Sequence, residues 1–299
     1  MRPVTGEQYV ITRGDSRAVI TELAASLREL VIDGVAVTPG FGEDVIPPYG
    51  HGIVLVPWPN RIPDGIWTLD GQQMLLDITE PDKHNAIHGL LRNTGYRLVR
   101  HDESSVELSA VVFPQHGYPF HLDTSVRYAL VEGTLEVTHE LHNLSDRPAP
   151  VAVGAHPYLS IGDEPTADLE LVIHADTHIE VDGRLNHLRE HAVDGTEWDL
   201  RQPRRVGDLT LDDAFGGVRT QDGVSARLRA ADGREVRLLQ DEAHGFVQCF
   251  VTDKFPGIPT AIAIEPMTAP ANAFNHGDGL RWLQPGEAWT VGWGIQYSA

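Results

Sequence analysis

Alternation of apolar and polar residues with a period of two constrains the fold of this chain more than any other feature. Apolar residues recur at every second position from Val106 to Val112 and again, with one histidine in the series, from Leu135 to Leu141. Successive side chains of a strand point to opposite faces of a sheet, so both segments are predicted to be half-buried strands.

Pairs of an acidic residue and glycine separate these runs. Asp and Gly tolerate positive φ, so an Asp-Gly pair between alternating segments predicts a hairpin. We expect residues 65–69 to pair with 72–78, and residues 226–230 to pair with 234–238. The pairs stand at Asp33-Gly34, Asp70-Gly71, Glu132-Gly133, Asp182-Gly183 and Asp232-Gly233.

Helical signals are few. Residues 21–30 fit either a helix or strand–turn–strand, and the polar, irregular residues 189–201 are predicted to form a loop. No linker or short repeat divides the chain, and its 29 glycines and 20 prolines suit many strands joined by turns. The sequence therefore predicts an all-β protein, with one large antiparallel β-sandwich domain over residues 1–299.

The chain is strongly acidic, with a formal net charge of −20. Such a surface repels nucleic acids and anionic membranes, so neither is an expected partner. No stretch approaches the roughly 18 apolar residues of a membrane helix, and residues 1–15 lack the apolar core of a signal peptide. The single cysteine, Cys249, excludes an intrachain disulfide and fits a reducing compartment. We expect a soluble, cytoplasmic protein, and no feature specifies an oligomeric state.

Near the C-terminus, a short apolar run carries one carboxylate. The spacing of Ile262 and Ile264 predicts buried strand positions, and Pro266 is expected to end the strand directly after Glu265. This would hold Glu265 at a sheet edge, where partial burial raises the pKa of a carboxyl group and prepares it for proton transfer. The alternative is a glutamate that ends a strand and points to water.

A histidine has similar surroundings in the segment Val151–Leu159. Apolar residues precede His156, and Pro157 biases it toward an extended conformation. Such a histidine is usually a core residue, but Glu265 also lies in an apolar segment next to a proline, and two titratable groups in different environments are the usual acid/base arrangement. Cys249 lies in another strand-like run and is expected to belong to the core.

The segment Pro57–Pro63 has the chemistry of a sugar-binding loop. Trp58 offers a flat apolar face on which a sugar ring could stack, and Arg61 offers a fork of hydrogen-bond donors. The alternative is a packed tryptophan beside a surface arginine. Phe250 and Trp282 are further candidates for stacking.

His84 and His88 are four residues apart, a spacing that suits a metal site on a helix. Glycine follows His88, no glutamate follows His84, and no cysteine is nearby, so we expect no metal here. His88 is better placed than His84 to face inward. Dinucleotide-binding, P-loop and serine-hydrolase motifs are missing from the sequence, so nucleotide cofactors and serine hydrolysis have no support.

From about Gly50 to Tyr297, the chain resembles the aldose 1-epimerase (galactose mutarotase) family. The resemblance implies a large antiparallel β-sandwich and an isomerase that interconverts the α and β anomers of a free aldohexose without any cofactor. It rests on the order and spacing of Asn60-Arg61-Ile62 with Gly65, Ile87-His88-Gly89-Leu90, Ala155-His156-Pro157-Tyr158, Leu211-Asp212-Asp213-Ala214-Phe215, and Glu265 with Asn272 and Phe274.

The resemblance also implies roles for single residues. Glu265 matches the general base that takes the proton of the C1 hydroxyl, and His156 matches the general acid that protonates the ring oxygen. Ring opening needs one base and one acid, which we expect on opposite sides of the C1–O5 unit. The residues that match sugar-binding positions are Asn60, Arg61, His88 and Asp212.

Several neighbours of these residues depart from the galactose-type pattern, so the resemblance indicates the reaction rather than the sugar. Two alternatives share the fold. One is a hexose-6-phosphate 1-epimerase, with Arg61 and Arg92 as candidate phosphate ligands. The other is a non-catalytic sugar-binding protein, which would not need an acid/base pair. The departures are Leu90, Ala155, Asp213 and Pro266-Met267, where such members usually carry Gly, Asn, His and Thr-Gln.

Overall fold

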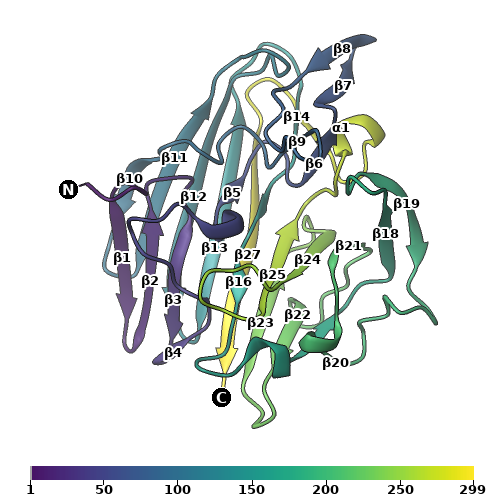
Figure 1. The fold of residues 1–299 in the computed structure, drawn as a ribbon. Helices are drawn as coiled ribbons and strands as arrows, with labels where there is room; N and C mark the ends of the chain where they lie inside the picture. The colour runs from purple at the N-terminus through teal and green to yellow at the C-terminus, as the bar shows by residue number, and fades with distance from the viewer. Residues whose placement is uncertain (1) are drawn as a thin grey trace.

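A computed structural model describes residues 2–299 of the chain, and antiparallel sheets dominate it (Figure 1). The largest sheet has nine strands, in the spatial order β10 (Arg97–His101), β11 (Ser105–Val112), β12 (Leu122–Val131), β13 (Thr134–Asn143), β27 (Ala288–Ser298), β23 (Glu235–Gln240), β22 (Val224–Arg229), β17 (Glu170–Ile173) and β20 (Arg204–Arg205).

A second sheet has eight strands. Its main path is β19 (His187–Ala192), β18 (Thr177–Val181), β21 (Asp212–Gly216), β24 (Phe246–Thr252), β25 (Ala261–Met267), β15 (Gly154–Ala155) and β5 (Val54–Leu55). The short strand β16 (Tyr158–Leu159) also pairs with β25.

The smaller elements complete the fold. A four-stranded sheet holds β1 (Gln8–Arg13), β2 (Ser16–Thr21), β3 (Leu27–Ile32) and β4 (Val35–Ala36). The two-stranded pairs are β6 (Arg61–Pro63) with β9 (Asn85–Ile87), β7 (Ile66–Leu69) with β8 (Gln72–Leu75), and β14 (Ala149–Val151) with β26 (Arg281–Leu283). The helical turns are η1 (Pro48–Gly50), η2 (Thr166–Asp168), η3 (Val206–Asp208) and α1 (Ala273–His276). None of the helices within residues 2–299 is long and apolar enough to cross a membrane.

The two large sheets share one apolar core, which confirms the predicted β-sandwich. Each fully buried aliphatic side chain in such a core contributes about 1.5–3 kcal/mol relative to an exposed one. Members from the nine-stranded sheet include Leu108, Val137 and Ile295, and members from the eight-stranded sheet include Val247, Ile262 and Ile264.

The predicted hairpins are present. Strands β7 and β8 pair across Asp70-Gly71, and β22 pairs with β23. Residues 21–30 adopt the strand–turn–strand alternative, because β2 ends at Thr21 and β3 begins at Leu27.

Two expectations about strands were wrong. The predicted loop at residues 189–201 begins with part of β19, an edge strand whose mostly exposed side chains give no apolar alternation. Pro266 does not end its strand, since β25 continues to Met267. The backbone N–H groups of Ile264 and Thr268 donate to the carbonyl oxygens of Pro157 and Val153. Pro266 lies midway between them in the strand, so its nitrogen faces the same side, opposite the interruption between β15 and β16. A proline without an N–H is tolerated there because that position requires no ladder hydrogen bond.

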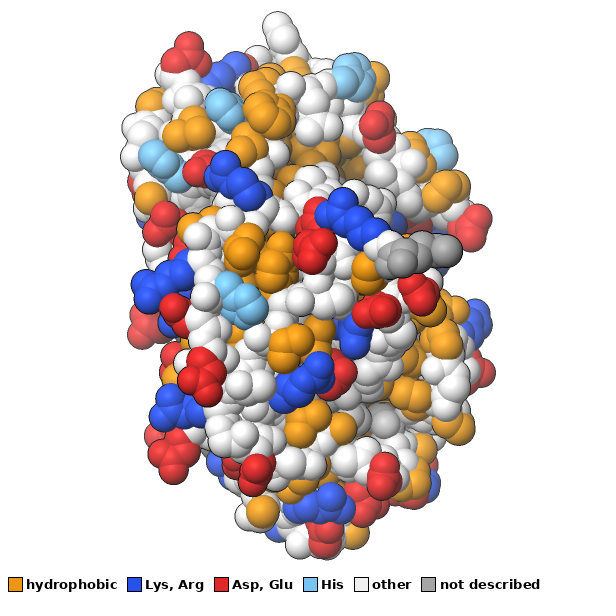
Figure 2. All heavy atoms as spheres, turned by 90° about the vertical axis from the view of Figure 1, so that its left-hand side faces the viewer, with side chains coloured by type: hydrophobic (Ala, Val, Ile, Leu, Met, Phe, Trp, Pro, Cys, Tyr) orange, Lys and Arg blue, Asp and Glu red, His pale blue; other side chains and the backbone are white. Residues whose placement is uncertain are grey.

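Charged side chains are dispersed over the surface in Figure 2, which shows the side of the molecule that lies on the left in Figure 1. Acidic and basic groups alternate there, with apolar side chains between them. On this face, the net charge of −20 is not concentrated in a single acidic patch.

Candidate active site

A pocket of about 940 Å³ lies on the face of the eight-stranded sheet opposite the shared core. The alternation of strand side chains explains its floor. In β25, Ile262 and Ile264 enter the core, so Glu265 points to the other face. In the neighbouring strand β24, Gln248 is paired with Glu265 and also faces the pocket.

Glu265 is almost completely buried, with 2% of its surface exposed. It lies on an interior strand of the sheet, between β24 and β15, and not at the sheet edge that the sequence predicted. Its Oε2 atom has no hydrogen-bond partner within residues 2–299. A buried carboxyl oxygen without a donor is costly and therefore points to a function.

His156 lies between β15 and β16, and its backbone is tied to the segment before β5. Its N–H donates to the carbonyl of Ile53 at 3.2 Å, and its carbonyl accepts from the N–H of Gly52 at 2.7 Å. The imidazole stacks on Tyr158, with ring centroids 5.5 Å apart, and meets the ring of His88 edge-on at 5.4 Å. These contacts hold the ring in one orientation at the pocket wall.

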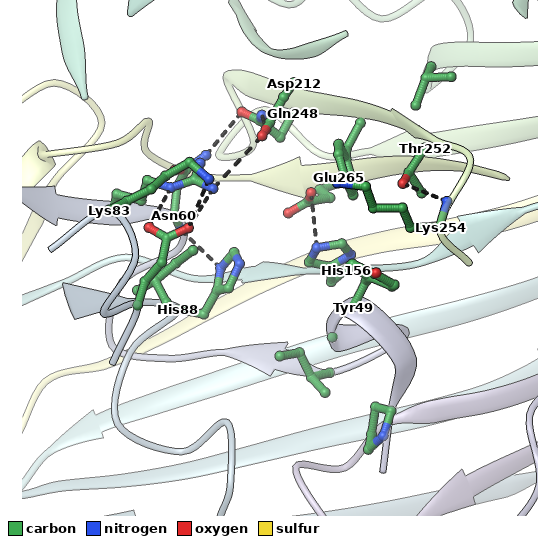
Figure 3. Close-up of a pocket in the computed structure, with 18 of the residues that line it drawn as sticks. Tyr49, Asn60, Lys83, His88, His156, Asp212, Gln248, Thr252, Lys254 and Glu265 are labelled. Carbon is green, nitrogen blue, oxygen red and sulfur yellow. Dashed lines mark hydrogen bonds and ion pairs between the residues drawn. The ribbon is translucent and has the colours of Figure 1, made fainter. Parts of the chain in front are cut away.

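The side chains of His156 and Glu265 point toward one another (Figure 3). The distance from His156 Nε2 to Glu265 Oε1 is 3.4 Å. The predicted arrangement on opposite sides of a sugar is therefore wrong, because nothing fits between atoms this close. The acid and base candidates stand side by side and face the pocket together.

Burial opposes the charged form of both groups. It lowers the pKa of His156 to about 4, and Arg61 and Arg92 act in the same direction. It raises the pKa of Glu265 well above its ordinary value, and the negative charge of Asp212 adds to this effect. Between these two pKa values the pair holds one proton, which belongs to both groups rather than to either.

Asn60 and His88 form a clasp beside this pair. The N–H of His88 donates to the carbonyl of Asn60 at 2.9 Å, and the N–H of Asn60 donates to Nδ1 of His88 at 3.3 Å. Gly89 allows the close approach of this loop, since it has a φ of +72° and a Cβ there would lie 2.0 Å from the carbonyl oxygen of Val56. Burial lowers the pKa of His88 well below its ordinary value, and the charges of Arg61 and Arg92 act in the same direction.

A chain of amide and carboxylate groups crosses the pocket floor. The amide nitrogen of Asn60 donates to Gln248 at 3.0 Å, and the amide nitrogen of Gln248 donates to Asp212 at 2.8 Å. Arg61 makes two hydrogen bonds to Glu80, from Nε at 2.9 Å and from Nη2 at 3.0 Å. Its fork is therefore largely occupied by a protein carboxylate, although the residue still lines the pocket.

All six residues predicted from the sequence line this one pocket: Asn60, Arg61, His88, His156, Asp212 and Glu265. Of the three aromatic candidates, Phe250 lines it, whereas Trp58 is buried in the core and Trp282 lies elsewhere on the surface. His84 does not line it either and contacts Asp64 instead. Within residues 2–299, no group of three or more His, Cys, Asp and Glu side chains is arranged to hold a metal.

Sequence reasoning missed several pocket residues. Gln248 had a usable signal, because it is a polar residue inside the apolar run 247–251. Tyr49, Glu80, Lys83 and Lys254 had none, since they come from irregular segments and short turns whose position only the fold determines.

A family model described as aldose 1-epimerase matches residues 7–296. The chain belongs to the aldose 1-epimerase family. It is 32% identical over 286 residues to an uncharacterized Escherichia coli K12 protein, YihR, with 95% of this chain and 91% of that protein covered. Because YihR is itself uncharacterized, this relative indicates no activity or substrate.

Solved structures of the family have the same fold. A GalM/aldose epimerase homologue from Caenorhabditis elegans superposes with a TM-score of 0.85 at 19% identity and covers 98% of each chain. A galactose 1-epimerase from Lactobacillus acidophilus gives a TM-score of 0.78 at 21% identity and covers 96% of this chain and 92% of its own. At these identities the similarity establishes the fold alone.

Proposed function

We propose that this protein is an aldose 1-epimerase that interconverts the α and β anomers of a free aldohexose. The observation that carries the proposal is the buried pair of His156 and Glu265, 3.4 Å apart, at the wall of a pocket of about 940 Å³. The pair holds one proton and needs no other group to move it.

The adjacency of the two side chains suits the reaction. The C1 hydroxyl and the ring oxygen O5 are bonded to the same carbon, so a neighbouring acid and base can reach both from one side. When the shared proton resides on His156, Glu265 is a carboxylate. Glu265 then accepts the proton of the C1 hydroxyl while His156 gives its proton to O5, and the C1–O5 bond breaks. After rotation about C1–C2, the aldehyde recloses with the proton transfers reversed.

The surroundings of the pair favour this chemistry. Proton transfer by positioned groups contributes roughly 10²–10⁴-fold to a rate. A site that excludes water strengthens each hydrogen bond and each charge interaction made within it. The polar side chains of Asn60, His88 and Asp212 offer donors and acceptors at which sugar hydroxyls would be held.

The two alternatives have less support. A hexose-6-phosphate 1-epimerase needs several free cations for a dianion, but Arg61 is bonded to Glu80 and Lys83 lies 3.8 Å from the same carboxylate. A non-catalytic sugar-binding protein does not need an acid/base pair, whereas His156 and Glu265 are both buried and lie 3.4 Å apart in the pocket.

The test is to measure anomer exchange at equilibrium by NMR, with purified protein and a panel of aldohexoses and their uronic acids. We expect acceleration of at least one of these sugars over the uncatalysed rate. If the folded protein accelerates none of them, the proposed activity is wrong, and the hexose-6-phosphate 1-epimerase and the sugar-binding protein remain as alternatives.

A further inference from the structure

Arg92 is a pocket-lining arginine that makes no ion pair within residues 2–299, although the negative charge of Glu80 opposes the lowering of its pKa by burial. It is half-buried, and its only side-chain hydrogen bond within the described residues is a long one of 3.5 Å from Nη1 to the carbonyl of Ile87. Among residues 2–299 no carboxylate lies within 4.0 Å of it. A guanidinium has five donors in a planar fork, so most of the hydrogen-bonding capacity of Arg92 is unused.

The other pocket cations differ from Arg92. Arg61 is bonded to Glu80 and lies 3.9 Å from Asp212. Lys83 lies 3.8 Å from Glu80. Lys254 is exposed, so water solvates its charge. Arg92 is therefore the one pocket cation, in the part of the chain that the structure describes, that is both partly desolvated and unpaired.

The position of Arg92 also affects the acid/base pair. Its positive charge helps to lower the pKa of both His88 and His156. A negative charge placed against Arg92 would cancel this repulsion and favour the protonated form of His156, which is the form that donates to O5. An anion at Arg92 would thus assist catalysis in addition to binding.

We propose that Arg92 binds a singly charged oxyanion group on the sugar substrate, such as the carboxylate of a uronic acid. This inference rests on the proposed function and narrows its substrate class. A single negative charge matches the one partly desolvated guanidinium without an ion pair. A phosphate dianion would need a second cation, but Arg61 and Lys83 already face Glu80 and Lys254 is solvated by water.

The experiment compares kcat/KM for D-glucuronate and D-galacturonate with the values for D-glucose and D-galactose, and adds D-glucose 6-phosphate as the dianion. A charge-assisted hydrogen bond predicts that at least one uronate exceeds its parent hexose by about 10-fold to 100-fold. Arg92→Met should bring this ratio close to one, and Arg92→Lys should retain part of it. Lys83→Met, which removes a cation already close to Glu80, is the matched control and should change the ratio by less than about threefold.

Each outcome decides the proposal. If kcat/KM for the neutral hexoses equals or exceeds that for the uronates, the role of Arg92 is wrong and the proposed aldose 1-epimerase activity stands. The same conclusion follows if Arg92→Met leaves the ratio of uronate to hexose kcat/KM unchanged. Preference for D-glucose 6-phosphate over both uronates would contradict the proposal that the bound oxyanion carries a single charge. Failure on every sugar would overturn the proposed function, and this inference with it. If Arg92→Met does not fold, the wild-type ratio and Arg92→Lys still decide.

Discussion

Two of the buried histidines, His156 and His244, contact a carboxylate in very different settings. In the pocket, His156 lies 3.4 Å from Glu265. In the turn between β23 and β24, Nδ1 of His244 lies 2.8 Å from Asp241. A contact between histidine and carboxylate does not by itself distinguish a site from a structural support.

The carboxylates differ in their partners. Asp241 accepts hydrogen bonds from the backbone N–H groups of Ala243 and Gly292 as well as contacting His244. Burial raises its pKa, but these donors outweigh burial, so the pKa is lowered overall. Glu265 has a buried oxygen without a donor, and its pKa is raised. Asp241 is thus held as a charged support, whereas Glu265 retains the capacity to exchange a proton with a ligand.

The largest expected effect is on kcat/KM, which should depend on the pair of His156 and Glu265 and not on the pair of His244 and Asp241. Glu265→Gln and His156→Ala should each lower kcat/KM by at least about 10²-fold, because each removes one half of the proton transfer. The double variant should lose little more than the worse single variant, since the two groups act as one unit. Anomer exchange by NMR measures these rates. Asp241→Asn is the control, and a loss there as large as in Glu265→Gln would break the distinction.

The next effect concerns pH. Below about pH 4, His156 gains a proton that the pair does not hold at neutral pH, so kcat/KM should fall about tenfold per unit there. On the alkaline side the rate should fall at a pH well above the ordinary pKa of a carboxyl group, where the pair loses its last proton. A profile of kcat/KM against pH tests both limits. An acid limb centred near 6.5, the ordinary value for histidine, would contradict the burial argument.

The free energy of unfolding should depend more on Asp241 than on Glu265, the reverse of their effects on activity. Asp241→Ala removes the acceptor of three hydrogen bonds and should lower the free energy of unfolding by about 1–2 kcal/mol at pH 7, allowing for its partial exposure. Because the folded-state pKa of Asp241 is lowered, its contribution is present above the ordinary carboxyl pKa and is lost as the pH falls through the lowered value. Urea unfolding at pH 7 and at acid pH measures this. Glu265→Gln should not destabilise the protein; a loss equal to that of Asp241→Ala would assign Glu265 a structural role.

The smallest effect concerns Tyr49 at the pocket rim. It has a φ of +49°, and 47% of its surface is exposed. A contact between its ring and a sugar would be worth about 0.5–1.5 kcal/mol, so Tyr49→Ala should raise KM about twofold to tenfold. Trp282→Ala, which removes an exposed aromatic ring outside the pocket, should leave KM unchanged. Equal effects of the two substitutions would remove the stacking role from Tyr49.

Much of the fold was predictable because strand periodicity and turn residues are local signals. The hairpin across Asp70-Gly71 and the core positions of Ile262 and Ile264 follow from neighbouring residues alone. The edge strand β19 was missed, since a strand with little buried surface has no alternation to read. Pro266 was misjudged because its missing N–H matters only if the neighbouring strand requires it.

The candidate site was predictable in its members and not in its geometry. The residue types and their order pointed to His156 and Glu265. Their 3.4 Å contact depends on β15, β16 and β25 being neighbours, which is a property of the sheet topology. By contrast, His244 and Asp241 lie three residues apart in the sequence, and that closeness indicates no activity.

The glycines behind the two pocket histidines set a limit for anyone who wishes to re-engineer the specificity of this enzyme family member. A Cβ at Gly89 would collide with the carbonyl of Val56, and a Cβ at Gly52 would lie 2.2 Å from the carbonyl oxygen of Leu27. Saturation libraries can therefore vary exposed rim positions such as Tyr49 and Lys254, while these two glycines should remain untouched. Directed evolution that respects this boundary changes the rim of the pocket without displacing the imidazoles of His88 and His156.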